Sequence, residues 1–99
     1  MSRTQVDFHP LAIEDAREAR LWYVERSQSA ADGFVGELQD AIARIQEAPL
    51  RAPAYIKGTR RVLFRRYPHY LVFQLVGDRA TVLAVAHGRR KPGYWEDRG

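Results

Sequence analysis

The sequence has no cysteine, which excludes a disulfide framework and any metal site built on thiolates. It also lacks a long hydrophobic run. The two longest, residues 71–76 (interrupted by Gln74) and 81–86, fall far short of the ~20 residues that a membrane-spanning helix needs. No apolar signal region follows residues 1–5. We therefore expect a cytoplasmic protein that makes no contact with a membrane.

Several chemical motifs are missing as well. There is no glycine-rich phosphate loop and no serine nucleophile elbow. The three histidines, His9, His69 and His87, stand far apart and never at the helical spacing that places two metal ligands on one face. We expect no metal, no cofactor and no small-molecule substrate.

Charge is present in quantity and is divided unevenly. Residues 1–50 contain 5 arginines and 9 acidic residues, whereas residues 51–99 contain 11 basic and 3 acidic residues. Fourteen of the sixteen cations are arginine, whose planar guanidinium forms bidentate contacts with phosphates and carboxylates. The second half is typical of a surface that binds nucleic acid or an acidic protein segment, although a solvated basic face without a partner has the same composition.

Periodicity predicts the elements of a single α+β domain over residues 1–99. Apolar residues recur at helical spacing in two segments, and after Gly58 the period changes to two. Pro10 suits the first turn of a helix, and Pro49 ends the second helix. The expected elements are a strand at 6–8, helices at 10–25 and between Ser29 and Pro49, and strands at 61–66, 70–76 and 79–87.

The order β-α-α-β-β-β predicts a helical hairpin packed on a small antiparallel sheet. Gly77 and Asp78 form a two-residue hairpin signal that sets Val76 opposite Arg79. Counted back from there, the register places Leu71 beside Ala84 and Gln74 beside Thr81. One face of the sheet is then apolar and covered by the helices, and the other is expected to face water.

The densest cluster of functional side chains follows the last strand. His87 is a candidate general acid or base, and Arg89 and Arg90 are candidates to neutralise a phosphate. Aromatic rings at the end of the cluster are candidates to stack on bases. The opposite interpretation is that His87 caps the edge of the sheet and the tryptophan belongs to the core. The candidate catalytic residues are His87, Arg89, Arg90 and Tyr94, and Lys91 and Trp95 are candidate contacts to a target.

A second group of arginines flanks the strand at 61–66. Arg60, Arg61, Arg65 and Arg66 either track a phosphate backbone and receive acidic side chains, or protect the edge of the sheet against aggregation. Tyr70, at the start of the next strand, is a further candidate contact, although tyrosines there are more often packing residues.

These pieces together resemble the RelE/ParE superfamily, the toxins of bacterial type II toxin–antitoxin systems, also called plasmid-stabilisation proteins. The resemblance covers about residues 8–98, and the order and spacing of its pieces carry it. They are Ala16 to Ala19, Trp22-Tyr23, Phe34 with Leu38, Ala41 with Ile45, Pro49, Arg60-Arg61, Tyr67-Pro68, the run from Leu83 through His87-Gly88-Arg89-Arg90-Lys91 to Pro92, and Trp95 with Arg98.

The resemblance implies a toxin that arrests growth until a cognate antitoxin wraps it with an acidic and hydrophobic segment. RelE-like members cut mRNA in the ribosome, and ParE-like members inhibit DNA gyrase. The RelE-like pattern has an arginine near the start of the third strand, where this chain has Tyr70, an arginine that Arg89 or Arg90 matches, and a late tyrosine that Tyr94 matches loosely. His87 and Arg89 form a pair that occurs among ParE-like members.

We therefore favour a ParE-like inhibitor of gyrase. Two alternatives remain open. One is a ribosome-dependent mRNA endoribonuclease, with His87 as acid or base beside Arg89 and Arg90, and this is the only reading in which the chain is an enzyme. The other is an RNA-binding module without toxicity, whose affinity falls steeply with salt.

Overall fold

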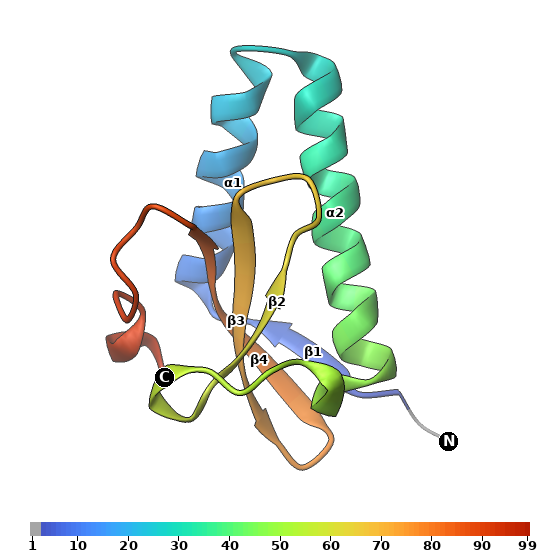
Figure 1. Ribbon diagram of the computed structural model, residues 1–99, viewed down its shortest axis with the longest axis vertical. Helices are drawn as coiled ribbons and strands as arrows, with labels where there is room; N and C mark the ends of the chain where they lie inside the picture. Colours follow the sequence, from blue (N-terminus) through green and yellow to red (C-terminus); the bar gives the residue numbers. More distant parts are fainter. Residues whose placement is uncertain (1–2) are drawn as a thin grey trace.

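The structure is a computed structural model that describes residues 3–99 (Figure 1). The expected α+β class and the order β-α-α-β-β-β are confirmed. Two helices run side by side against a four-stranded sheet and extend beyond it at one end (Figure 1). The elements are β1 (Gln5–Phe8), α1 (Pro10–Val24), α2 (Gln28–Glu47), β2 (Arg60–Leu63), β3 (His69–Val76) and β4 (Arg79–His87), with short 3₁₀ turns at Pro49–Arg51, Ile56–Gly58 and Glu96–Arg98.

The strands lie in the order β1-β4-β3-β2. The three later strands pair antiparallel, as expected, but β1 pairs with β4 in parallel, so the sheet is mixed rather than wholly antiparallel. The reason is the chain path: the helical hairpin separates β1 from the other strands and acts as a crossover, which a parallel pair requires. The sheet consequently has β1 at one edge and β2 at the other.

Local sequence signals set the helix ends. Pro10 occupies the first turn of α1, and the His9 ring caps it by accepting a hydrogen bond from the Leu11 N–H at 3.1 Å. Ser27 caps α2 by accepting from the Ala30 N–H at 3.1 Å, so α2 begins at Gln28, just before the expected start at Ser29. The connection between the helices is short, which makes them antiparallel neighbours.

The register of the β3–β4 hairpin changes part of the way along. Val76 opposes Arg79 and Gln74 opposes Thr81, as expected, but a bulge at Val72/Phe73 follows. Beyond it Leu71 opposes Val85 rather than Ala84, because β4 contains one residue more than β3 over this stretch. The expectation for the far end of the hairpin was therefore wrong by one residue.

The helices cover one face of the sheet and enclose the larger core. Phe34 from α2 lies at its centre with no exposed surface, stacked on Tyr23 and 5.5 Å from the Phe64 ring. Strand residues of alternate positions complete it, as a sheet with one covered face requires. The buried members are Ala12, Phe34, Ala41, Ile45, Ala52, Val62, Phe64, Leu71, Phe73, Ala80, Val82 and Val85.

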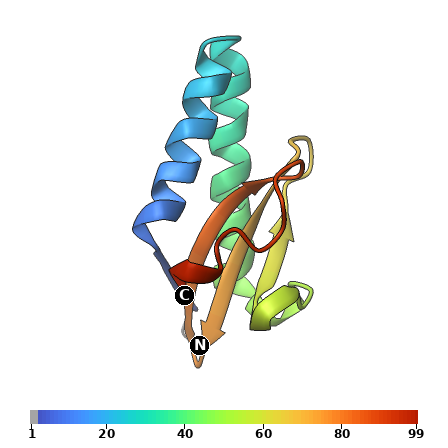
Figure 2. The same cartoon turned by 90° about the vertical axis from the view of Figure 1, so that its left-hand side faces the viewer.

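The opposite face of the sheet does not face water throughout, which corrects the sequence-based expectation. The C-terminal segment, residues 88–99, turns back along the sheet from the end of β4 (Figure 2). Its Trp95 is 1% exposed and packs on Tyr70, Val72, Leu83, Ala84 and Ala86 to form a second, smaller core. Trp95 and Tyr70, which the sequence offered as contacts for a partner, are therefore buried.

Candidate functional site

A hollow of about 510 Å³ lies where the end of β4 and the start of β3 meet the flank of α1. It is open to solvent and has a mixed lining of cations, imidazoles, carboxylates and aromatic rings. The residues that line it are Asp15, Glu18, Ala19, Trp22, Tyr23, Pro68, His69, Val85, His87, Arg89, Arg90 and Tyr94.

All four candidate catalytic residues reach this hollow: His87, Arg89, Arg90 and Tyr94. His87 is the last residue of β4, and its Nδ1 accepts a hydrogen bond from the Arg89 N–H at 3.0 Å. That contact holds the turn after β4 against the imidazole and leaves Nε2 as the nitrogen available for proton transfer. The structure brings the four residues together, and a catalytic role for them stays a prediction.

The cations of this turn are free of carboxylates. Within residues 3–99, no acidic side chain pairs with Arg89, Arg90 or Lys91. The Arg90 guanidinium lies 3.9 Å from the centre of the Tyr94 ring, a cation–π contact that orients it without using its N–H donors. Lys91 is exposed but does not line the hollow. The turn therefore presents a cationic rim able to receive an anionic group.

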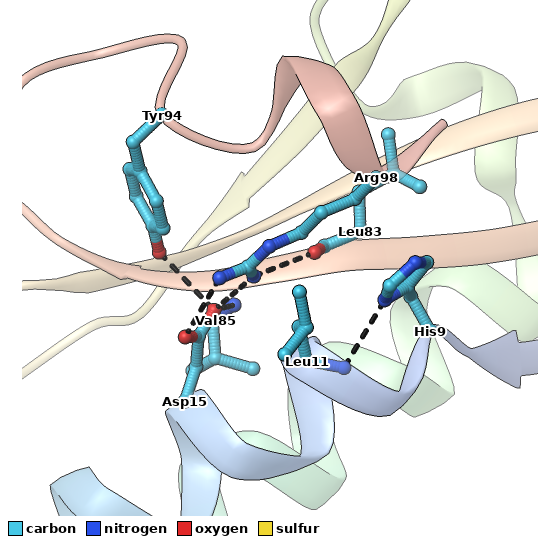
Figure 3. Close-up of polar contacts among 7 residues, drawn as sticks. All are labelled: His9, Leu11, Asp15, Leu83, Val85, Tyr94 and Arg98. Atoms are coloured by element: carbon cyan, nitrogen blue, oxygen red, sulfur yellow. Dashed lines mark hydrogen bonds and ion pairs between the residues drawn. The ribbon is translucent and has the colours of Figure 1, made fainter.

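The Tyr94 side chain is hydrogen-bonded within the protein. Its hydroxyl donates to the Asp15 carboxylate at 3.1 Å (Figure 3). Burial and the nearby Asp15 charge raise the pKa of the Tyr94 phenol, so the ring stays protonated at neutral pH. A neutral phenol already bonded to a carboxylate is poorly suited to act as an acid or base toward a bound molecule.

The hollow also contains two imidazoles in edge-to-face contact, a pair that sequence reasoning missed. His69 opposes His87 across β3 and β4, with ring centres 5.0 Å apart and planes at 82°. His69 is buried and its Nδ1 has no hydrogen-bond partner. Burial, and then the neighbouring His87, lower the pKa of His69 to about 4. Without the bulge in β4 the hairpin register sets His69 opposite Ala86, so the pairing was not visible in the sequence.

The arginines around β2 form a separate group outside the hollow. Arg60 donates to the Ala52 carbonyl at 2.8 Å, and the Arg61 guanidinium lies 4.3 Å from the centre of the Tyr55 ring. The Arg65 and Arg66 side chains are exposed in the turn after β2. The two groups of arginines therefore do not form one continuous site around the hollow.

The outer edge of β2 is closed by side chains of α2 and by a neighbouring loop. Glu37 accepts from the backbone N–H of Arg65 at 2.6 Å, and Arg44 donates to the Leu63 carbonyl at 3.1 Å. The Arg61 N–H is bonded to the Pro53 carbonyl. These contacts occupy much of the edge that another strand would use. A target-binding role for Arg60, Arg61, Arg65 and Arg66 stays a prediction.

Two predicted contact residues are buried. Trp95 stacks on the Tyr55 ring at 5.7 Å, and Tyr70 is only 5% exposed beneath them. The Trp95 side chain is 1% exposed and belongs to the second core, so this structure leaves no ring surface on which a base could stack. Burial and a hydrogen bond with Tyr55 raise the pKa of Tyr70 to about 12, so it stays neutral.

The aromatic residue that does remain available is Trp22. Its side chain is 52% exposed and lines the hollow, with the Arg26 guanidinium 3.5 Å from the centre of its ring. Position 22 falls just outside the Ala12, Ala16, Ala19 and Tyr23 stripe, and that offset was the signal of its exposure.

Two absences apply to the part of the chain that is described, residues 3–99. None of its helices is long and apolar enough to cross a membrane. No group of three or more histidine, aspartate or glutamate side chains there is arranged to hold a metal ion.

Comparison with known proteins gives a consistent result. The family described as ParE toxin of the type II toxin–antitoxin system parDE matches residues 6–92. Among solved structures, the chromosomal ParDE toxin–antitoxin system from P. aeruginosa is similar with a TM-score of 0.74 at 17% identity, over 86% of this chain and 96% of that one. A free-state mutant of the E. coli toxin RelE is similar with a TM-score of 0.62 at 14% identity, over 99% and 94%.

At these identities the structural similarities establish the fold alone, and a search of curated proteins finds no match. The family match carries more weight, because it spans nearly the whole chain, from β1 to the turn that follows β4. The chain therefore belongs to the ParE toxin family within the RelE/ParE superfamily, and it is the toxin of a type II toxin–antitoxin system with an antitoxin as its partner.

Proposed function

We propose that this toxin arrests growth by inhibiting DNA gyrase through a protein–protein contact, without cutting RNA. The proposal rests on the burial and the neutral side chain of Tyr70. In the RelE-like pattern an arginine stands near the start of the third strand, and here that position holds a buried, neutral tyrosine covered by Trp95. A cation needed at a transition state cannot be supplied from that position. The proposal also sets the action of the chain in the cytoplasm, where gyrase works.

The distribution of charge supports a binding role. Arg89, Arg90 and Lys91 have no carboxylate partner in the described chain, so an acidic surface of a target would meet cations that are not already neutralised. Trp22 lines the same hollow as Arg89 and Arg90 and supplies exposed aromatic surface of the kind that is enriched at interfaces.

The direct test is a supercoiling reaction with purified gyrase and relaxed plasmid, with and without the chain. We expect the product to lose supercoils as the chain is added. Supercoiling that stays unchanged at a large excess of folded chain would remove the gyrase proposal.

Arg89→Ala with Arg90→Ala is expected to weaken growth arrest strongly, and more than His9→Ala. Arg17→Ala with Arg20→Ala is the matched control, because it removes the same charge from exposed positions of α1. Equal loss of toxicity in the two arginine pairs would indicate a general effect of net charge instead of a contact surface.

A second candidate is ribosome-dependent cleavage of mRNA. The observation in its favour is that one hollow gathers His87, Arg89, Arg90 and Tyr94. Mapping of RNA ends in a translating extract separates the two candidates. Cuts within codons that disappear in His87→Ala would favour this second candidate over gyrase inhibition. Because the chain belongs to a toxin family, the non-toxic RNA-binding module is no longer a candidate.

A further inference from the structure

One carboxylate joins the first helix to the last residues of the chain. Asp15 of α1 accepts hydrogen bonds from the Val85 N–H at 3.1 Å and the Tyr94 hydroxyl at 3.1 Å. It also accepts from both terminal nitrogens of Arg98, at 2.7 and 3.3 Å, and Arg98 donates in addition to the Leu83 carbonyl at 2.9 Å. Figure 3 shows these groups converging between α1, β4 and the C-terminal segment.

The position of this cluster follows from the end of β1. The parallel pairing of β1 with β4 stops at Phe8 and Val82, where α1 begins. Beyond that point the bulge in β4 turns the Val85 N–H and the Leu83 carbonyl away from β3. Asp15 and Arg98 satisfy this donor and this acceptor. Beyond the end of β1, the Asp15 and Arg98 side chains thus replace that strand as hydrogen-bond partners of β4.

The ion pair between Asp15 and Arg98 differs from the others. Its side chains are 11% and 9% exposed, whereas every other ion pair among residues 3–99 joins side chains that are at least 34% exposed. Exposed pairs contribute little, but removal of one partner from a buried pair leaves an uncompensated charge away from water. The hydrogen bonds to Asp15 are therefore difficult to open one at a time.

The cluster also determines where part of the hollow lies. Asp15 holds the Tyr94 hydroxyl, and the Tyr94 ring in turn carries the Arg90 guanidinium. A direct chain of contacts thus links the buried pair to the cationic rim at the hollow. Arg98 itself lies outside residues 6–92, the span that the family matches.

We propose that Asp15 and Arg98 are positioning residues of the toxin: they clamp the C-terminal segment onto α1 and so hold Tyr94 and the Arg89–Arg90 turn in the arrangement that growth arrest requires. Neither residue needs to touch the target. The inference rests on the toxin family and is independent of whether the target is gyrase or the ribosome.

The clamp itself is tested by amide hydrogen exchange on protein from cell-free synthesis. In Arg98→Ala the Val85 amide, which donates to Asp15, is expected to exchange roughly a hundredfold faster, because a buried charge loses its partner. Far-UV circular dichroism checks that the helices persist. In a Trp22→Phe background, used only for spectroscopy, Trp95 is the sole tryptophan, and its emission is expected to shift to the red as the segment opens.

The consequence is tested by induction of the same variants in bacteria without an antitoxin. Arg98→Ala is expected to restore colony formation, and Arg98→Lys, which keeps the charge but loses the planar fork, is expected to arrest growth partially. Arg79→Ala is the matched control, since Arg79 pairs with Asp7 on the surface of the same sheet at 60% and 42% exposure. It should leave both Val85 exchange and growth arrest unchanged.

Two results would overturn the proposal. Native exchange at Val85 in Arg98→Ala would mean that the ion pair clamps nothing. Fast exchange with full growth arrest would mean that the position of the segment does not matter for toxicity. If Arg98→Ala loses its helical circular dichroism signal, Val85 exchange and growth arrest are measured in Arg98→Lys and Asp15→Asn instead. The same two results would then overturn the proposal. If the native chain arrests growth but does not inhibit gyrase, the gyrase proposal fails and this inference is unaffected.

Discussion

The two faces of the sheet are covered by different means. The helices cover one face with apolar side chains centred on Phe34, and the C-terminal segment covers the other with Trp95 and a buried ion pair between Asp15 and Arg98. The first cover comprises two long elements whose stripes repeat, and the second is a segment of twelve residues without regular structure beyond one 3₁₀ turn. A short segment has too little apolar surface to stay in place by packing alone, so it is also held by directional polar contacts.

This difference has a functional counterpart. The helix-covered face contributes stability, whereas the segment-covered face lies next to the cations that remain free to bind. A change in the first face is expected to affect the whole domain, and a change in the second is expected to affect the segment first. The following predictions test that division, in order of decreasing effect.

Phe34→Ala is expected to have the largest effect. The side chain is fully buried and contacts Tyr23, Phe64 and His69. Its removal should lower the free energy of unfolding by about 3–5 kcal/mol, a large part of the total stability of a small domain. Urea denaturation followed by circular dichroism measures this loss. A loss below about 1 kcal/mol would indicate that the helices are not the principal cover of the sheet.

Acid is expected to weaken the domain through His69. The native pKa is lowered from 6.5 to about 4 by burial and by His87, while the unfolded chain titrates near its ordinary value. Between these two values the unfolded state binds a proton that the native state does not, so stability falls as the pH drops from 6.5 to 4 and is unaffected by this group above 6.5. His87 and Tyr23 are the titratable groups in ring contact with His69.

The measurement is the urea midpoint as a function of pH. His69→Phe keeps an aromatic ring among Tyr23, Phe34 and Phe64 and is expected to flatten the profile over this interval. An equally steep profile in His69→Phe would assign the acid sensitivity to the carboxylates instead.

Two tyrosine hydroxyls compare the faces directly. Tyr94 donates to the charged Asp15, and Tyr67 donates to the Ala30 carbonyl of α2 at 2.6 Å. Tyr94→Phe is expected to cost about 1.5–3 kcal/mol and Tyr67→Phe about 0.5–1.5 kcal/mol, because bonds to charged groups are stronger. Thermal or chemical denaturation gives both values. The reverse order would mean that the segment contributes less to stability than the turn against the helices.

The smallest effects come from two glycines of α2, which should change stability in opposite directions. A methyl group at Gly33 would collide with the Tyr67 hydroxyl, whereas at Gly36 it would meet nothing within 4 Å. Gly36→Ala is expected to raise stability by about 0.5–1 kcal/mol through helix propensity. Gly33→Ala is expected to lose this gain and to destabilise, because Tyr67 must move away from Ala30. A stabilised Gly33→Ala would show that the Tyr67 contact is dispensable.

Local patterns in the sequence determined the elements. The stripe of Phe34, Ala41 and Ile45 located the second helix, and Pro10 located the start of the first. The alternation after Gly58 located the strands, because such signals act within a few residues. They also fixed the near end of the β3–β4 hairpin, since a two-residue turn sets the pairing beside it. The cluster from His87 to Tyr94 was visible as a cationic and aromatic run, and four of its members do line one hollow.

Only the tertiary structure decided which distant residues meet. The bulge in β4 placed His87 opposite His69, and no local pattern in the sequence predicted the extra residue in β4. Asp15 and Arg98 form a buried pair although they are 83 residues apart in the sequence, and no local pattern pairs them. The sequence around Trp95 did not distinguish a buried ring from an exposed one. Burial and pairing of this kind depend on the path of the whole chain, which brings together groups that the sequence separates.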